Sequence, residues 1–254
     1  MANGFSNALF DFLFPMKLLT NFFCSTLGKK YVMAVTGAAM FLFVIGHMIG
    51  NLQFFLGPEA INRYGHFLQS NLEIIWPARI GLLLMVVLHV WSAASLSREN
   101  KAARPVQYAN WKPNTASYAS RTMLMSGLII AAFIIYHLLH YTVMVEAVNL
   151  KHVDFHTLNE VTEDGTHRHD IFTMMATGFS NPFVSGFYVI AIGLLCLHLS
   201  HGVSAMFQSL GLKNHVYAPM LDKFAKGISV LIFLGYVSIP IAVLLGYGKD
   251  CCSL

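Results

Sequence analysis

Histidines lie inside four long apolar runs of this sequence. The runs are FLFVIGHMIGN with His47, LLLMVVLHVWS with His89, FIIYHLLHYTV with His137 and His140, and LLCLHLSHGVS with His198 and His201. An ionisable side chain within a membrane span is costly and usually functional. Imidazoles can bind haem iron, relay protons or form hydrogen bonds between helices, so the residue type alone leaves all three roles open.

The elements that would carry these histidines are predicted from composition. Of 254 residues, 56% are hydrophobic and only 11% are charged, whereas soluble domains average about 25% charged residues. Crossing a hydrocarbon core of about 30 Å as a helix takes about 20 apolar residues. A bare backbone has no hydrogen-bond partner in lipid, so helices are expected; the alternating segments of a barrel are not found. The sequence predicts an all-α polytopic membrane bundle.

Five transmembrane helices are predicted, at residues 31–56, 74–97, 119–149, 181–210 and 221–247. Turn-forming dipeptides support the boundaries, because Gly57-Pro58 follows the first run and Asn181-Pro182 opens the fourth. Residues 1–30 are predicted to be a cytoplasmic or interfacial arm, and 31–254 a single transmembrane domain. The Phe-rich stretch 5–14 is too short to span and is expected at the membrane surface.

The basic residues predict the orientation of the bundle. A cytoplasmic N-terminus places eleven of them inside (Lys17, Lys29, Lys30, Arg98, Lys101, Arg104, Lys112, Arg121, Lys213, Lys223, Lys226) and five outside (Arg63, Arg79, Lys151, Arg168, Lys249). This is the bias expected of a multi-pass protein. The same scatter lacks the basic patch of a nucleic-acid-binding protein, so no nucleic-acid partner is expected.

The cysteines do not predict a metal centre. Cys24, Cys196, Cys251 and Cys252 form no CxxC pair, and an iron–sulfur cluster or a structural zinc needs such ligand spacing. Cys251 and Cys252 are most simply two thiols of the C-terminal tail, and lipidation or contact with a partner remains open.

Four of the histidines fall at matching depths. His47, His89, His137 and His198 lie 15–18 residues after the predicted starts of their spans. Because successive spans reverse direction, the first and third of these reach the outer half of the membrane and the other two the inner half. The two levels differ by something on the order of 10 Å. Facing histidines in a helix bundle can bind a haem at both axial positions, so two b-type haems between the first four helices are predicted. Glycines such as Gly37 would make room for the rings, although small residues also serve ordinary helix packing.

Sequence motifs spread over most of the chain resemble a known family. They are GHM at His47, EAINRYGHFLQS after it, LHVW in the second run, SG ten residues before His137, and HLSHGVSAMFQSLG in the fourth run. From about Lys29 to Lys226 the chain resembles the five-helix, two-haem cytochrome b membrane subunit of succinate:quinone oxidoreductases. This family includes menaquinone-linked succinate dehydrogenases and quinol:fumarate reductases.

The resemblance implies a specific ligand set. It selects His137 over His140 and His198 over His201. The implied pairs are His47 with His137 for the distal, outer haem, and His89 with His198 for the proximal, inner haem. The candidates for groups around the haems are His140, His201, Arg79 and Arg121; both arginines are equally compatible with anchoring at the membrane surface.

The resemblance also implies partners. These are a flavoprotein subunit, which carries FAD and the dicarboxylate site, and an iron–sulfur subunit docked on the cytoplasmic face of a bacterial inner membrane. This chain has neither a nucleotide-binding glycine fingerprint nor cluster cysteines, so its activity would be that of a membrane subunit in respiration and the tricarboxylic acid cycle. The basic segments 98–112 and 213–226 are candidates for docking, or serve orientation and lipid contact. A higher oligomer of the complex is compatible with this.

The quinone, which the family implies is menaquinone, would bind near the distal haem. The acidic position that is important in the family aligns with Gln69, and an amide cannot readily accept a proton. His66, three residues earlier, has a side chain that exchanges protons near neutral pH. Both residues are equally compatible with a polar loop at the membrane edge.

Two other functional classes stay open. One is the cytochrome b subunit of another respiratory complex, of the hydrogenase or nitrate reductase type. The other is a transporter with a histidine proton relay. The physiological direction, meaning succinate oxidation or fumarate reduction, and the coupling to protons do not follow from the sequence.

Overall fold

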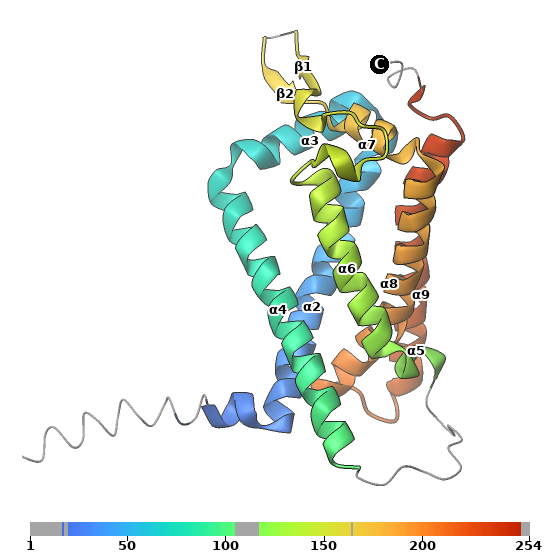
Figure 1. Ribbon diagram of the computed structural model, residues 1–254. Helices are drawn as coiled ribbons and strands as arrows, with labels where there is room; N and C mark the ends of the chain where they lie inside the picture. The colour runs from blue at the N-terminus through green and yellow to red at the C-terminus, as the bar shows by residue number, and fades with distance from the viewer. Residues whose placement is uncertain (1–16, 18–19, 105–116, 164, 250–254) are drawn as a thin grey trace, which may run out of the picture.

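Five long helices form the part of the protein that the structure describes. The computed structural model describes residues 17, 20–104, 117–163 and 165–249. Within this part of the chain the long helices are α2 (Thr26–Leu52), α4 (Leu72–Ala102), α6 (Met123–Tyr141), α8 (Pro182–Ser209) and α9 (Ala218–Leu244), which run side by side in Figure 1. All five are long and apolar enough to cross a membrane. The prediction of a five-helix, multi-pass membrane bundle is therefore confirmed.

Two helix starts follow directly from local sequence. The side chain of Ser25 accepts a hydrogen bond from the Gly28 amide at 3.0 Å and caps α2. Asn181 accepts from the Phe183 amide at 2.9 Å, and Pro182 occupies the first turn of α8. A side-chain oxygen at the cap satisfies an amide without a helical partner, and proline has no amide to satisfy. Helix α2 thus begins five residues before the predicted span, inside the predicted arm; the stretch 5–14 lies outside the described residues.

The third predicted span, 119–149, is wrong at both ends. A separate short helix, α5 (Tyr118–Arg121), precedes α6, and α6 ends at Tyr141. The next residues leave the helix, and Met144 has a φ of 56°, a left-handed conformation that stops helical hydrogen bonding. The sequence TVMV at this point is as apolar as the helix before it, so hydropathy alone does not show where the helix ends.

One end of the bundle, called the hairpin end here, carries a cap of short elements. These are η1 (Gln53–Leu56), α3 (Pro58–Ser70), η2 (Glu146–Val148), η3 (Phe155–Thr157), β1 (Asn159–Val161), β2 (His167–His169) and α7 (Ile171–Phe179). The two strands pair antiparallel, with Glu160 opposite Arg168. Figure 1 shows α3 and α7 lying across the ends of the long helices. The sequence predicted none of these short elements.

Polar contacts hold this cap together. The buried guanidinium of Arg168 forms ion pairs with Glu59 of α3 and Glu160 of β1. Hydrogen bonding to Glu59 is the main reason that the pKa of Arg168 is raised above its usual value. The Asn62 amide donates to Asp170 at 3.0 Å, and its oxygen accepts from the Phe172 amide at 2.9 Å. Side chains of α3 therefore fix the start of α7.

The opposite end, called the turn end, is held by two ion pairs. Lys29 of α2 pairs with Glu99 of α4. Lys213, in the α8–α9 connection, pairs with Asp222 of α9 at 2.7 Å and contacts Ser204 of α8 at the same distance. These contacts join α2 to α4 and α8 to α9 at the level where the helices would leave the membrane.

The long helices differ in burial. Within the part of the chain that the structure describes, the α8 span is the most buried of the five and the α4 span the least. Large apolar side chains point outward from every span, including Leu42, Leu83, Ile135, Ile190 and Leu231. Exposed apolar side chains are the normal surface of a protein in lipid.

Candidate functional site

The structure brings the four histidines at matching depths into two pairs. The His47 ring from α2 and the His137 ring from α6 have centroids 5.8 Å apart and planes at 80°. His89 from α4 and His198 from α8 have centroids 6.5 Å apart and planes at 61°. Helices α2, α4, α6 and α8 each contribute one ring, whereas α9 contributes none.

The spacing within each pair fits two axial ligands of one haem iron. A bond from a metal to an imidazole nitrogen is about 2 Å long, so two imidazoles on opposite sides of an iron place their ring centroids about 6 Å apart. Both observed separations, 5.8 and 6.5 Å, are close to this value. Among the described residues, no group of three or more His, Cys, Asp or Glu side chains could hold a bare metal ion. Two-histidine ligation of haem needs no such group.

Hydrogen bonds orient the rings of the His89–His198 pair. The Nδ1 atom of His89 lies 3.1 Å from the Met33 carbonyl oxygen and 3.1 Å from the Thr36 hydroxyl, both on α2. A carbonyl can only accept, so the bond to Met33 requires the proton on Nδ1 and leaves the lone pair on Nε2. The Nδ1 atom of His198 lies 3.2 Å from the hydroxyl of Ser126 on α6. A metal-binding histidine typically holds its second nitrogen in this way.

Glycines allow neighbouring helices to approach these two rings. A Cβ atom at Gly37 would lie 3.2 Å from Cε1 of His89, and one at Gly127 would lie 3.5 Å from Cε1 of His198. The first distance is tighter than most Cβ contacts, so a side chain at Gly37 would displace the His89 ring. Each ring of this pair is therefore held between a hydroxyl and a glycine of the adjacent helix.

Aromatic rings surround the His47–His137 pair instead. Phe43 stacks on His47 at 5.3 Å, and Phe133 stacks on His137 at 6.0 Å. In both cases the phenylalanine lies four residues earlier on the same helix, a spacing that brings side chains together. Tyr236 of α9 lies 6.2 Å from His47 and donates its hydroxyl to the Val44 carbonyl at 2.7 Å.

A tyrosine hydroxyl links His137 to His140. Tyr188 Oη, from α8, lies 3.4 Å from Nδ1 of His137 and 3.0 Å from Nδ1 of His140. If the Nε2 atom of His137 binds a metal, its Nδ1–H donates to Tyr188, and the tyrosine proton goes on to Nδ1 of His140. His140 is then left with an Nε2–H, and this fully buried atom has no partner among the described residues. His140 thus lies behind His137, consistent with a supporting role.

The contacts described for the other predicted site residues, His201, Arg79 and Arg121, do not assign them to a haem. His201 lies one turn beyond His198, within electrostatic reach of Lys213 and Asp222. Arg79 lies over the Trp76 ring at 5.5 Å, and Arg121 lies over the Tyr118 ring at 6.0 Å. Each arginine thus packs on an aromatic ring of its own helix, so the assignment of either to a haem remains a prediction.

The quinone-site candidates lie on α3, at the hairpin end. The side chain of His66 is half-buried, with Nε2 3.3 Å from the Ser70 hydroxyl, and Gln69 is exposed. The alternative reading of this segment as a polar loop is wrong in form, because residues 58–70 are helical. Whether either residue contacts a quinone stays a prediction.

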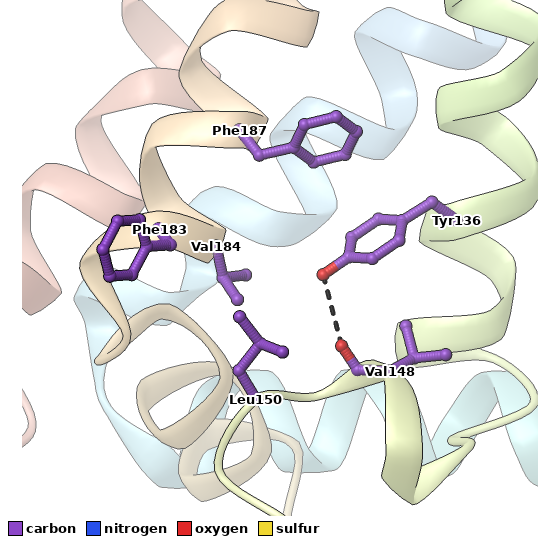
Figure 2. Close-up of a pocket in the computed structure, with 6 residues that line it drawn as sticks. All are labelled: Tyr136, Val148, Leu150, Phe183, Val184 and Phe187. Atoms are coloured by element: carbon purple, nitrogen blue, oxygen red, sulfur yellow. Dashed lines mark hydrogen bonds between the residues drawn. The ribbon is translucent and has the colours of Figure 1, made fainter.

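An apolar cavity lies between α6, α8 and the segment that follows α6. It has a volume of about 290 Å³ and is lined by Tyr136, Val148, Leu150, Phe183, Val184 and Phe187. Figure 2 shows the Tyr136 hydroxyl directed at the Val148 carbonyl, 3.4 Å away. The Tyr136 and Phe187 rings are in edge-to-face contact, with centroids 5.0 Å apart. The Tyr136 ring also lies 5.6 Å from His140. Such a space suits a hydrocarbon tail or a flat ring.

Sequence reasoning missed Thr36, Ser126 and Tyr188. Their hydroxyls stand out as polar groups within apolar runs, which is a usable indication. Their partners, however, are on other helices.

Comparisons of the chain with models of protein families, with curated proteins and with solved structures find no match. What is shown is therefore a five-helix apolar membrane bundle that holds two histidine pairs.

Proposed function

We propose that the chain is the di-haem cytochrome b membrane anchor of a succinate:quinone oxidoreductase in a bacterial cytoplasmic membrane. The observation that carries the proposal is the presence of two histidine pairs on four helices, with centroid separations of 5.8 and 6.5 Å. A pair of histidines in a proton path needs a hydrogen-bonded chain but no fixed separation. Two pairs at about the spacing of trans axial ligands favour haem.

Each group of residues has a role in this proposal. His47 with His137, and His89 with His198, would hold the two haems. Bound haems would supply one-electron transfer between a soluble partner and a membrane quinone. The hydrogen bonds to Nδ1 of three of these histidines hold the rings and would leave Nε2 free to bind the metal. The phenylalanine rings stacked on His47 and His137 would hold these two imidazoles by apolar contact.

The turn end would face the partner subunits. The N-terminus and the basic residues of this end are on the cytoplasmic side in the orientation set by the positive-inside bias. Lys29 and Lys213 are occupied by carboxylates, so the exposed Arg98 and Lys223 remain for docking. Dicarboxylate chemistry and FAD would belong to the flavoprotein, and the iron–sulfur clusters to the second soluble subunit. Most of the loop 98–112 lies outside the described residues.

Haem quantitation tests the proposal most directly. The purified chain should contain two protohaems, and alanine at His47, His89, His137 or His198 should each remove one. Alanine at His66, which is outside both pairs, is the matched control and should leave both haems. A wild-type protein that is well folded, intact and free of haem would contradict the proposal.

The quinone part is tested separately. A menaquinone substrate would exchange protons with His66 at the hairpin end, so His66→Phe should slow quinone reduction while both haems stay bound. Gln69→Ala serves as comparison, because an amide can support binding but not proton exchange. Unchanged turnover in His66→Phe would remove His66 from the site.

One observation favours a second candidate, a transporter with a histidine proton relay. The hydrogen bonds from His137 through Tyr188 to His140 are one segment of the kind that a proton path is built from. A reduced-minus-oxidised absorbance spectrum separates the two, because a transporter would be colourless. For a haem protein, co-purification with a flavoprotein would separate a succinate-linked complex from one of the hydrogenase or nitrate reductase type.

A further inference from the structure

A second cavity, on the surface of the bundle between α8 and α9, plays no part in the histidine site. Its volume is about 300 Å³, and it is lined by Gly193, Cys196, Leu197 and Ser200 of α8 and by Lys226, Ser229, Val230 and Phe233 of α9. The two helices run in opposite directions, so Ser200 and Lys226 mark one end and Gly193 and Phe233 the other. Seven residues of helix separate the two ends, so the groove runs about 10 Å along the bundle axis.

The walls of this groove are apolar despite the two serines. Ser200 donates its hydroxyl to the Leu197 carbonyl and Ser229 to the Ala225 carbonyl, both at 2.7 Å. Each hydroxyl is therefore satisfied within its own helix. Gly193 has no side chain, and a Cβ there would lie 3.8 Å from the Phe233 ring, so the glycine keeps the far end open. A hydrocarbon chain suits this lining better than a polar ligand does.

A positive charge lies at the other end of the groove. Lys226 is exposed and lies at the turn end of α9. The nearby carboxylate of Asp222 is bound directly by Lys213 and by Ser204, and Lys226 attracts it more weakly than either of these does. Among the described residues, neither Lys226 nor the neighbouring Lys223 forms an ion pair. The groove is thus a narrow apolar trough that ends at an exposed lysine, Lys226, whose ammonium forms no direct ion pair among the described residues.

We propose that this groove binds an anionic phospholipid, with one acyl chain along the trough and the phosphate at Lys226. Basic pockets between transmembrane helices are suited to anionic head groups. A lysine that merely reaches toward the membrane surface needs no trough below it. The proposal does not depend on haem, since the groove contains none of the four paired histidines.

Lipid retention tests the site with the purified full-length chain. The chain is washed free of lipid in detergent and incubated with phosphatidylglycerol or with phosphatidylcholine, and bound lipid is counted by native mass spectrometry. The wild type should retain one phosphatidylglycerol in preference to phosphatidylcholine. Lys226→Gln should weaken this retention about fivefold, the effect of one lysine near an anionic lipid. Gly193→Leu should abolish it by filling the trough.

Controls separate the site from general charge effects. Lys30→Gln removes an exposed lysine from the same end of the bundle, on α2 and away from the groove, and should leave retention unchanged. If Gly193→Leu does not fold, as judged by gel filtration, Val230→Phe fills the same trough from a lipid-exposed position. Three results would each overturn the proposal: equal loss in Lys30→Gln and Lys226→Gln, full retention in the filled variant, or no preference of the wild type for phosphatidylglycerol.

Discussion

The two histidine pairs are alike in residue type and ring spacing but are supported differently. In the His89–His198 pair, hydroxyls and a carbonyl of neighbouring helices bind Nδ1, and glycines contact the rings. In the His47–His137 pair, stacked phenylalanines and a tyrosine hydroxyl surround the rings. The first pair is thus oriented by direct polar contacts to adjacent helices, and the second mainly by aromatic packing. The two sites should therefore fail under different substitutions.

Filling the space beside His89 should lower the haem content more than any other substitution described below. In Gly37→Leu, side-chain atoms occupy the place of the His89 ring, because even a Cβ would lie 3.2 Å from it. We expect the loss of about one of the two haems, with the His47–His137 site retained, as measured by haem content. Gly227→Leu on α9, where nothing lies within 4 Å of a Cβ, should keep both. Retention of both haems in Gly37→Leu would mean that the ring is not confined as described.

Removal of the Tyr188 hydroxyl should affect only the other pair. Tyr188→Phe leaves Nδ1 of His137 without an acceptor, and loss of such a partner weakens metal binding about tenfold. In a His89→Ala background, where only a haem at the His47–His137 pair would remain, haem titration and the absorbance band should both change. Tyr236→Phe is the matched control, because its hydroxyl binds a backbone carbonyl and not a histidine. Equal effects of the two tyrosine variants would contradict a specific role of Tyr188.

Removal of the hydroxyl groups that contact His89 and His198 should weaken haem binding less than the Tyr188 substitution does, and by different amounts at the two positions. Ser126→Ala removes the only hydrogen bond described for Nδ1 of His198, and we expect about fivefold weaker haem binding. Thr36→Ala should change binding less, because the Met33 carbonyl still holds His89. The comparison is made in a His47→Ala background by haem titration. A larger effect in Thr36→Ala would show that the carbonyl does not orient His89.

Loss of the polar contacts in the cap should lower stability without disturbing the two histidine pairs. Arg168→Ala removes ion pairs to Glu59 and Glu160, and we expect the midpoint of thermal unfolding in detergent to fall by about 5 °C. Haem content should stay the same. Arg63→Ala, which removes an exposed arginine of α3, should leave the midpoint nearly unchanged. Loss of haem in Arg168→Ala would show that the cap also shapes the outer pair.

The sequence predicted the long helices better than the cap. Runs of about 20 apolar residues are a strong indication of a membrane helix, so all five spans were found. Helices α3 and α7 are short, and their form depends on contacts such as Asn62 with Asp170, which are 108 residues apart. No local pattern reports such contacts. The end of α6 was missed for a related reason, since the residues after Tyr141 stay apolar.

For the candidate site, the sequence indicated the ring partners but not their supports. Counting residues along reversed spans grouped His47 with His137 and His89 with His198, and the structure brings the same rings together. The depth of a residue in the membrane can be counted along its own helix. Which side chains of a neighbouring helix it meets cannot be counted in this way. Tyr188 is 48 residues from His140, and its role depends on how α6 and α8 are rotated against each other.

The length of α6 has a consequence for the whole bundle. With 19 residues, this helix is about 28 Å long, close to the hydrocarbon thickness of about 30 Å. The other four helices have 27 to 31 residues and can tilt or protrude. With little length to spare, α6 tolerates less tilt than the four longer helices before its apolar segment becomes shorter than the hydrocarbon layer. A thicker bilayer would have to thin around α6 to accommodate the protein.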